Sequence, residues 1–314
     1  MKPQKNISKI LLNSAAVIVV LGAVVSVMVL RQTPDMATPD TSIVTATELL
    51  RHTPTTRTFD APLVGARAVH ILDVNSGRTL YSKNADEEYA IASLTKIMTA
   101  LVAAEESPDP NNHVVQIDAY ALVTDGESGF WYGEQWNLAD LIEFTLVSSS
   151  NDGAAAIAAA LTSFVDEPTF VDAMNTKASE LGLTHTRFKN PTGLDINFET
   201  EPGAFGSARD MSTLFAHVLI EYPELLEATQ VQTVAVASLD RLHSVDNTNN
   251  IVNAIPWVLG AKTGYTDRAG GNLVVAFEAG PGRPIVVTVL GSTKDGRFSD
   301  MEALIDATLT HISA

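Results

Sequence analysis

Three short strings of residues lie far apart along this 314-residue chain, and a fold that uses them must bring all three together. They are Ser93-Leu-Thr-Lys96, Ser149-Ser150-Asn151 and Lys262-Thr263-Gly264. At ordinary residue frequencies each string arises by chance about once or less in a chain of this length. Their order and their surroundings therefore carry the inference, and together they predict a site for serine acyl transfer.

The first string opens a run with helical spacing. Apolar residues recur at that spacing between residues 93 and 104, so we expect a helix there. A serine that begins a helix is usually only a cap. Lys96 changes that interpretation, because it lies one helical turn after Ser93 on the same face. Serine is a weak nucleophile, and a buried, neutral lysine can be the adjacent base that it needs. Ser93 is therefore the candidate nucleophile, and Lys96 is its candidate base.

The other two strings supply further groups that this chemistry requires. Lys262 can be a second cation that favours the neutral form of Lys96. The hydroxyl of Ser149 is expected to bridge the two lysines and to pass a proton to the leaving group. Asn151 offers an amide that can donate to a substrate carbonyl and accept from Lys96.

The string Lys262-Thr263-Gly264 has the composition of a turn, which is its alternative interpretation when it is taken alone. It precedes an apolar strand pattern at residues 272–277, so we expect it on or beside a sheet edge. Gly264 allows a ligand backbone to come close there. The two other strings favour the interpretation as part of a site.

From about Ala66 onward, the chain resembles the low-molecular-mass penicillin-binding proteins of the D-alanyl-D-alanine carboxypeptidase family. The segments that carry the resemblance are 92–100, 146–152, Asn190-Pro-Thr-Gly-Leu-Asp195, Ser207-Ala-Arg-Asp-Met211, Asn247-Thr-Asn-Asn250 and 260–266. The resemblance implies a serine-type D-Ala-D-Ala carboxypeptidase that acts on peptidoglycan stem peptides through an acyl-enzyme on Ser93. It also implies covalent inhibition by β-lactam antibiotics and no cofactor.

The resemblance implies roles for further groups. The backbone N–H groups of Ser93 and Tyr265 would form the oxyanion hole. Thr263 and Gly264 would contact the substrate, and Thr263 would hold its terminal carboxylate. Arg297 falls where the family has a carboxylate-binding arginine, and a planar guanidinium suits paired hydrogen bonds. Taken alone, Arg297 has the ordinary character of a surface charge, so its role depends on the resemblance.

Three alternative functions stay open. A D,D-endopeptidase would cut peptidoglycan cross-links with the same residues, and the sequence does not separate it from a carboxypeptidase. A class A β-lactamase needs an additional glutamate that activates water. No Glu-x-x-Leu-Asn string between Asn151 and Lys262 supplies one. A catalytically silent wall-binding protein would be marked by the loss of Ser93, Lys96 or Lys262, and all three are present.

Residues 10–30 form an almost unbroken apolar stretch of 21 residues, which as a helix spans about 30 Å. Three lysines precede the stretch and acidic residues follow it at Asp35 and Asp40, so the positive-inside rule places the N-terminus in the cytoplasm. We expect residues 1–31 to be a cytoplasmic tip and a transmembrane signal anchor. The protein would then be a single-pass protein of the bacterial cell membrane with an extracytoplasmic catalytic domain. A cleaved signal peptide is the alternative.

The composition of residues 32–314 predicts how the rest of the chain is organised and which partners and sites it lacks. Residues 32–60 are rich in threonine and proline and predict a stalk, while residues 61–314 suffice for the D,D-peptidase catalytic domain. The formal net charge is −17 and residues 1–31 contain no acidic residue, so the acidic remainder argues against nucleic acid as a partner. Cysteine is absent, which excludes disulfides, and the histidine spacing predicts no metal site.

Periodicity predicts the layout of the domain. A β-hairpin is expected at residues 66–73 and 79–82, two more strands at 271–279 and 284–291, and a closing helix at 299–312. Further helices are expected at 138–146, 152–164, 170–181 and 208–220. This order predicts an α/β fold of the α+β kind, in which an antiparallel sheet is flanked by helices and holds an inserted, mostly helical lobe. The resemblance implies that it is β-lactamase/transpeptidase-like, with the site in the cleft.

Overall fold

The computed structural model describes residues 58–123, 129–165, 169–197 and 200–313. These residues belong to one compact unit, Thr56–Ala314. The predicted tip and anchor at residues 1–31 lie outside the described residues, as do residues 32–57 of the predicted stalk. No helix within the described ranges combines the length and the apolar character that a membrane span requires.

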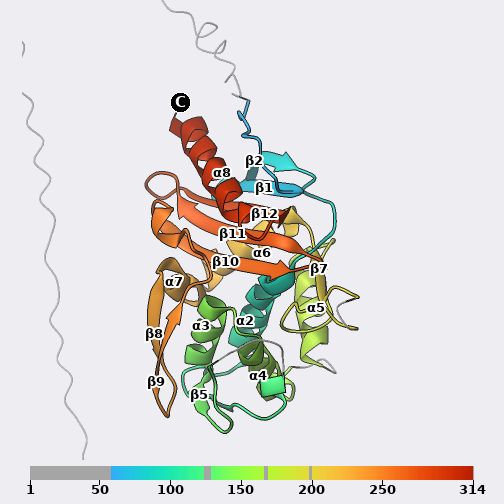
Figure 1. The fold of residues 1–314 in the computed structure, drawn as a ribbon, viewed down its shortest axis with the longest axis vertical. Helices are drawn as coiled ribbons and strands as arrows, with labels where there is room; N and C mark the ends of the chain where they lie inside the picture. The colour runs from blue at the N-terminus through green and yellow to red at the C-terminus, as the bar shows by residue number, and fades with distance from the viewer. Residues whose placement is uncertain (1–57, 124–128, 166–168, 198–199, 314) are drawn as a thin grey trace, which may run out of the picture. The chain divides into compact units, whose positions relative to one another are not determined.

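An antiparallel sheet organises this unit, with its strands in the order β10-β11-β12-β1-β2 (Figure 1). The strands are β1 (Ala68–Asp73), β2 (Arg78–Lys83), β10 (Val258–Thr266), β11 (Gly270–Glu278) and β12 (Pro284–Ser292). Strand β1 pairs with β12, with Ala68 opposite Leu290 and Asp73 opposite Ile285. Residues near both ends of the unit therefore build one sheet, and the segment between β2 and β10 is an insertion. Strand β10 lies at the edge.

The sheet has two apolar faces because side chains alternate along each strand. On β12, Ile285 and Val287 belong to one hydrophobic core, and Val286 and Leu290 belong to the other. Helix α8 (Gly296–Ser313) packs on the first face and α6 (Ala208–Glu221) packs on the second (Figure 1). Burial on both faces explains why the strand sequences are almost continuously apolar.

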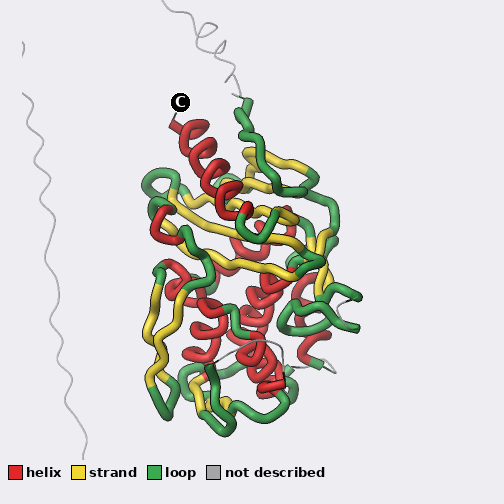
Figure 2. The backbone as a smooth tube through the Cα atoms, viewed as in Figure 1, coloured by secondary structure: helices red, strands yellow, loops and turns green. Residues whose placement is uncertain are grey.

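The inserted lobe is built around helix α2 (Thr95–Glu106), which is buried from Thr95 to Ala103. The helices α3 (Leu138–Ser148), α4 (Asn151–Leu161) and α5 (Phe170–Glu180) contact it, and α6 contacts it from the sheet side. A short helix, α7 (Glu224–Glu227), leads back toward the sheet. Figure 2 shows this group of helices beside the strands of the sheet. Helix α2 therefore has partners on several sides, which accounts for its burial.

Short elements connect the larger ones. The small sheets are β3 (Tyr89–Ala90) with β7 (Ala204–Gly206) and β6 (Arg187–Phe188), β4 (Val114–Gln116) with β5 (Gln135–Asn137), and β8 (Thr233–Ala237) with β9 (Leu242–Asp246). The 3-10 turns are η1 (Ala92–Leu94), η2 (Ala121–Val123), η3 (Ala228–Gln230) and η4 (Val252–Ala254). None of these elements is predicted from the sequence, because pairs and turns of two to five residues are too short to show a period.

The predicted fold class is confirmed: an antiparallel sheet is flanked by helices and holds an inserted, mostly helical lobe. The helix boundaries differ by a few residues. The helix expected from residue 93 begins as the 3-10 turn η1, and α2 starts at Thr95 with no side chain capping it. Ser93 is therefore not a helix cap, and its hydroxyl is available for another role.

Candidate active site

Lys96 is the centre of a hydrogen-bond network that joins the first two strings. Its Nζ atom donates to Ser93 Oγ at 2.9 Å, to Asn151 Oδ1 at 2.8 Å and to the carbonyl oxygen of Thr192 at 2.8 Å. The side chain of Lys96 is fully buried on α2. Three acceptors thus hold one buried amine beside the hydroxyl of Ser93.

The third string meets the second through Lys262 and Ser149. Lys262 lies on the edge strand β10, is 2% exposed, and donates from Nζ to Ser149 Oγ at 2.8 Å. The predicted bridge through Ser149 is present on this side only. Within the described site, the hydrogen bonds of Lys96 go to Ser93, Asn151 and Thr192 and not to Ser149. The structure therefore brings the three strings together, with Ser149 bonded to one of the two lysines.

The second string occupies the junction between two helices. Helix α3 ends at Ser148, and Ser149 takes a left-handed conformation with φ 60°. Such a residue ends a helix and turns the chain. Ser150 then caps α4, because its side chain accepts from the backbone N–H of Gly153 at 3.0 Å. Asn151 is the first residue of α4. The turn explains why Ser149 and Asn151, two residues apart, reach different lysines.

The turn that carries Ser93 is packed tightly against its neighbours. Ala92 has a φ of 49°, which is uncommon for a residue with a side chain. A Cβ atom on Gly264 would come within 2.8 Å of the Ile91 carbonyl oxygen and 3.2 Å of Ser93 N. The close approach at Gly264 is thus made by the chain's own backbone. The glycine allows β10 to lie directly beside the turn.

Burial sets the protonation of both lysines. It lowers the pKa of Lys96 to about 7. Burial first, then the charges of Lys96 and Arg297, hold the pKa of Lys262 well below its usual value. A low-dielectric site disfavours the charged amine, and a second nearby cation disfavours it further. Near neutral pH, the neutral form of Lys96 is therefore well populated and lies 2.9 Å from Ser93 Oγ.

The remaining predicted residues lie along β10 and at the start of α8. Thr263 is buried, and its hydroxyl shares a hydrogen bond of 2.6 Å with the hydroxyl of Thr248. Arg297 is 7% exposed, and one terminal nitrogen donates to the Gly264 carbonyl oxygen at 3.0 Å. Its Nε atom has no partner in the described part of the chain. Burial lowers the pKa of Arg297. Arg297 is therefore a buried group at the site.

Tyr265 follows Gly264 on β10, and its side chain is 38% exposed. The hydroxyl donates to Asp267 Oδ1 at 2.7 Å. The ammonium of Lys294 lies 5.2 Å from the centroid of the ring, which allows a cation–π contact. The ring is thus held away from the hydrogen bonds of Lys96 and Lys262. This leaves the backbone of Tyr265 as the part that adjoins the Ser93 turn through Gly264.

Three further residues at the site were not singled out from the sequence for such a role. The Thr192 carbonyl receives a hydrogen bond from Lys96, and the Thr248 hydroxyl is bonded to Thr263. Asn272, fully buried on β11, donates to the carbonyl oxygen of Ala90 at 3.0 Å. Thr192 and Thr248 lie in segments that carried the family resemblance, which was the available signal. Asn272 stood in an apolar strand pattern as its single amide, and a buried amide needs partners.

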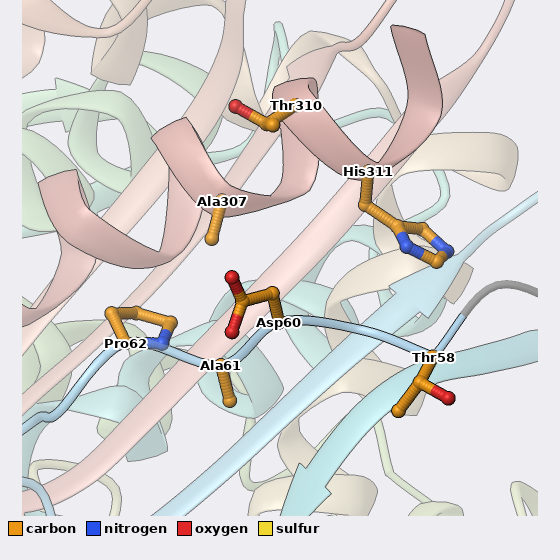
Figure 3. Close-up of a pocket in the computed structure, with 7 residues that line it drawn as sticks. All are labelled: Thr58, Asp60, Ala61, Pro62, Ala307, Thr310 and His311. Carbon is orange, nitrogen blue, oxygen red and sulfur yellow. The ribbon is translucent and has the colours of Figure 1, made fainter. Parts of the chain in front are cut away.

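A separate hollow, of about 290 Å³, lies between residues 58–62 and α8. Figure 3 shows Asp60 and Pro62 from the first segment and Thr310 and His311 from the helix around it. None of the predicted site residues lines this hollow. Among the residues that the structure describes, no three histidines, cysteines or acidic residues are grouped so that they could hold a metal ion.

Comparisons with known proteins agree on one family. The family model described as D-alanyl-D-alanine carboxypeptidase matches residues 55–294. The D-alanyl-D-alanine carboxypeptidase DacF of Bacillus subtilis is 32% identical over 246 residues, which cover 77% of this chain and 61% of the relative. The D-alanyl-D-alanine endopeptidase of Pseudomonas aeruginosa is 33% identical over 242 residues, which cover 74% of each chain.

A solved structure gives the same assignment. Penicillin-binding protein D2 of Listeria monocytogenes, in an ampicillin-bound form, is 28% identical with a TM-score of 0.64, over 78% of this chain and 97% of that chain. The chain spans 61% to 62% of the length of the first curated carboxypeptidases that it matches. The family match itself covers most of the unit that holds the three strings. The chain belongs to the D-alanyl-D-alanine carboxypeptidase family.

Proposed function

We propose that this protein is a serine-type D-Ala-D-Ala carboxypeptidase that acts on peptidoglycan stem peptides. The observation that carries the proposal is the contact between Lys96 Nζ and Ser93 Oγ at 2.9 Å, with burial lowering the pKa of the lysine to about 7. A base with a pKa near the working pH is suited to activating a hydroxyl. Family membership supports the choice of substrate.

In the first step, Ser93 Oγ attacks the carbonyl carbon of the penultimate D-alanine while neutral Lys96 takes the hydroxyl proton. The carbonyl oxygen becomes an oxyanion, which the backbone N–H groups of Ser93 and Tyr265 stabilise. The short gap between β10 and the Ser93 turn, in which only a glycine fits at position 264, supports this role for the two N–H groups. Asn151 orients Lys96 through Oδ1 at 2.8 Å.

In the second step, the bond between the carbonyl carbon and the leaving nitrogen breaks. Ser149 Oγ gives its proton to that nitrogen, and Lys262, 2.8 Å from Ser149 Oγ, returns a proton to the hydroxyl. The terminal D-alanine leaves, and the acyl group stays on Ser93 as an ester. Before the second half-reaction, Lys96 gives its proton to solvent and Lys262 takes one up, which restores the starting protonation states. Water then attacks the ester while neutral Lys96 takes its proton, and Lys96 passes this proton to Ser93 Oγ as the ester bond breaks and the carboxylic acid product leaves.

We assign the terminal carboxylate of the substrate to Thr263 and Arg297. Both are buried at the site, and Arg297 keeps guanidinium N–H groups beyond the one that donates to Gly264. A buried guanidinium without a carboxylate partner is costly, and a substrate carboxylate supplies the missing charge. The Listeria protein in its ampicillin-bound form supports β-lactams as covalent inhibitors of this site as well.

A D,D-endopeptidase is the second candidate, because the endopeptidase of Pseudomonas aeruginosa is 33% identical to this chain. Endopeptidase cleavage would use the same Ser93, Lys96 and Ser149. It differs in the leaving group, which is a peptide rather than a single D-alanine. The two functions can therefore be distinguished by which substrate the protein cleaves.

The test incubates the full-length chain with a pentapeptide ending in D-Ala-D-Ala and with a cross-linked dimer, and it follows the products by mass spectrometry. Release of D-alanine from the pentapeptide is expected, and cleavage of the dimer alone would make the protein an endopeptidase. Fluorescent penicillin should label the wild type and leave Ser93→Ala unlabelled. Ser148→Ala is the control, because the Ser148 hydroxyl is bonded only to the Phe144 carbonyl oxygen within the described residues. A labelled Ser93→Ala variant would remove Ser93 from the mechanism.

We also propose that residues 1–31 anchor the protein in the bacterial cell membrane, with the catalytic unit outside and residues 32–60 as the stalk. The support is the apolar stretch of 21 residues and the lysines that precede it. Fractionation of cells that express the full chain tests this. The protein should sediment with membranes and resist extraction by salt, and external protease should release the catalytic unit.

A further inference from the structure

Four large apolar side chains are exposed together at the far end of the helical lobe. Trp131 and Tyr132, just before β5, are 64% and 73% exposed, and Leu239 and Leu242, at the tip of the β8–β9 hairpin, are 52% and 71% exposed. Figure 1 shows β5 and the end of this hairpin at the end of the lobe that lies away from the central sheet. We call these four residues the lobe-end patch. Exposed apolar side chains that gather in one place mark an interaction surface.

Hydrogen bonds join the two halves of the lobe-end patch. The backbone N–H of Leu239 donates to the Gln135 carbonyl oxygen at 2.8 Å, and the backbone N–H of Gln135 donates to Asp240 Oδ2 at 2.7 Å. Arg241 lies over the Trp131 ring, with its Cζ atom 3.4 Å from the ring centroid. The guanidinium thus holds the indole in place, and the indole remains largely exposed to a ligand.

A buried carboxylate fixes the backbone beside the indole. Glu134 Oε2 accepts from the backbone N–H of Trp131 at 3.1 Å, and the backbone N–H of Glu134 donates to the Trp131 carbonyl oxygen at 3.1 Å. Glu134 Oε1 lies 2.6 Å from His243 Nε2 on β9, and the side chain of Glu134 is fully buried. A ligand that meets the Trp131 ring therefore finds it preorganised, which lowers the entropy lost on binding.

The lobe-end patch is connected with the candidate active site through Phe130. The side chain of Phe130 is buried, and a Cβ atom on Gly153 would lie 3.4 Å from its ring. Gly153 is in the first turn of α4, two residues after Asn151, whose side chain contacts Lys96. The residue next to Trp131 thus packs against the helical turn that begins with Asn151.

A hollow of about 680 Å³ runs along this side of the lobe. It is lined by Phe130 and by Ser148 and Asp152, the two residues that flank the string Ser149-Ser150-Asn151. Among the residues described for its wall, none has a role in the mechanism above. The hollow therefore lies beside the catalytic groups, and it leaves room for a ligand between the second string and the residue before Trp131.

The lobe-end patch fits an uncharged polymer with apolar faces better than a charged or a protein partner. Its charged neighbours are engaged, because Arg241 covers Trp131 and Asp240 accepts from the backbone of Gln135. Stable protein interfaces take about 20–30 residues on each side, whereas this patch, as far as the chain is described, presents four large apolar side chains. The face of an aromatic ring is negative and attracts polarised C–H groups. The faces of N-acetylated sugar rings present such C–H groups and carry no charge.

We propose that the lobe-end patch binds the glycan strand of peptidoglycan, with sugar rings stacked on Trp131 and Tyr132, while a stem peptide of the same strand reaches Ser93. The inference rests on the proposed carboxypeptidase function and adds the polysaccharide as a second contact. An extended peptide spans about 3.5 Å per residue, so the glycan lies several residues away from Ser93 and not among the catalytic groups. Two linked contacts raise the effective concentration of the stem peptide at the site.

The test compares a pentapeptide that ends in D-Ala-D-Ala with the same pentapeptide attached to a short glycan of N-acetylglucosamine and N-acetylmuramic acid. The full-length wild type should release D-alanine from the glycan-linked peptide with a kcat/KM about tenfold higher, because the glycan adds the second contact. In Trp131→Ala the ratio should fall to about one, while the kcat/KM for the free peptide stays unchanged. Tyr132→Ala should lower the ratio as well, and Trp131→Phe, which keeps an aromatic face, should retain most of it.

The control is Trp257→Ala, which removes an indole that is 72% exposed directly before β10, outside the patch. It should keep the wild-type ratio, which excludes a general effect of losing an exposed tryptophan. A peptide-free oligomer of N-acetylglucosamine should inhibit the turnover of the glycan-linked peptide and leave that of the free peptide unchanged. Fluorescent penicillin measures the fraction of each variant that has a folded site.

The outcomes separate this inference from the proposed function. Equal kcat/KM values for the two substrates in the wild type, or a ratio that persists in Trp131→Ala, would overturn the glycan contact and leave the carboxypeptidase in place. A wild type that is dimeric, with a monomeric Trp131→Ala variant, would assign the patch to a second copy of the chain instead. Absence of D-alanine release from either substrate would overturn both proposals.

Discussion

Asn272 Nδ2 donates to the carbonyl oxygen of Ala90 at 3.0 Å and so ties the central sheet to the strand that leads into the Ser93 turn. Asn272 lies on β11 opposite Gly264 of β10, and its Oδ1 atom accepts from the backbone N–H of Gly291 at 2.8 Å. The side chain is fully buried. One amide thus joins β12, β11 and the segment before Ser93. We infer that it helps to set the distance between the turn and β10.

The variant Asn272→Ala should acylate with penicillin at least about tenfold more slowly than the wild type. It leaves the Ala90 carbonyl and the Gly291 N–H without partners, which costs about 1–3 kcal/mol for each such buried group. The loss of stability is read from denaturant unfolding, and the acylation rate is read from stopped-flow labelling. Because the Ser93 turn is displaced, the rate should fall even among the molecules that stay folded.

A matched control separates stability from positioning. Ser212 on α6 and Thr288 on β12 share a hydrogen bond of 2.8 Å, are both fully buried, and make no hydrogen bond to the segment of residues 90–95 in the described part of the chain. Ser212→Ala should lower the free energy of unfolding and keep the acylation rate. If both variants slowed acylation in proportion to their loss of stability, Asn272 would have only a structural role.

Much of the fold followed from pattern. Four of the five strands of the central sheet, all except β10, and the longer helices around it are predicted within a few residues, because long apolar periods are strong signals. The string with Lys262 is expected on or beside a sheet edge, and it lies on β10, which is an edge strand of the sheet. The hairpin of β8 and β9 was missed, since its five-residue strands show only weak alternation between buried and exposed positions.

The site was predictable as a set of residues and not as a set of contacts. The three strings predict Ser93, Lys96 and Lys262 as members of one site. Periodicity does not say which carbonyl approaches a lysine from 96 positions away, as Thr192 does to Lys96. The expected bridge from Ser149 to both lysines required distances, and the structure shows the bond to Lys262. Long-range contacts of this kind depend on tertiary packing, which a single sequence does not display.

The rate of acylation should rise with pH through a pKa of about 7. Burial lowers the pKa of Lys96 to about 7, and only the neutral amine can accept the Ser93 proton. Below that pKa, Lys96 is protonated and acylation is slow. Above it, the neutral form of Lys96 dominates and the rate is high until Lys262, whose pKa burial also lowers, loses the proton that it returns to Ser149. The acylation rate is measured by stopped-flow labelling with a fluorescent penicillin from about pH 5 to about pH 9, which is about two units on either side of the expected pKa.

The variant Lys96→Arg should remove this acylation at every pH in the range, because a guanidinium keeps its proton there. The midpoint pH of the wild-type profile should shift little with ionic strength, because Lys96 is fully buried. Salt would shift the pKa of an exposed lysine more strongly. A wild-type rate that stays constant from pH 5 to 9, about two units around the expected midpoint, would rule out Lys96 as the titrating base.

Arg297→Ala should reduce the turnover of peptides that have a free terminal carboxylate about tenfold more than that of their amidated analogues. The guanidinium is buried at the site and is assigned to that carboxylate, and charge-assisted hydrogen bonds are stronger than neutral ones. The kcat/KM values for both peptides give the ratio. Arg283→Ala is the control, since Arg283 pairs with Asp73 at the other end of β12. Equal losses on both peptides would withdraw Arg297 from the carboxylate site.

Alanine variants at two glycines test how tightly the loop of Gly193 packs against the Ser93 turn. Gly193 has a φ of 79°, and a Cβ atom there would come within 2.0 Å of the Ala92 carbonyl oxygen. Gly77, in the hairpin between β1 and β2, has a φ of 66° and open space around it. Gly77→Ala should therefore cost only the backbone term of about 1–2 kcal/mol. Gly193→Ala adds a steric clash with the residue before Ser93.

We expect Gly193→Ala to lower the free energy of unfolding by more than Gly77→Ala and to slow acylation, while Gly77→Ala keeps the wild-type rate. Denaturant unfolding and penicillin labelling measure the two effects on the same samples. The Ala92 carbonyl also accepts from the Thr95 hydroxyl at 2.7 Å, so a displaced carbonyl would disturb the first turn of α2 as well. If both variants lost equal stability and acylated equally fast, the loop of Gly193 would not control the position of Ser93. Both positions have a positive φ, so both variants carry the backbone cost of alanine there. The difference in their free energies of unfolding therefore measures the clash of the Gly193→Ala Cβ atom with the Ala92 carbonyl oxygen.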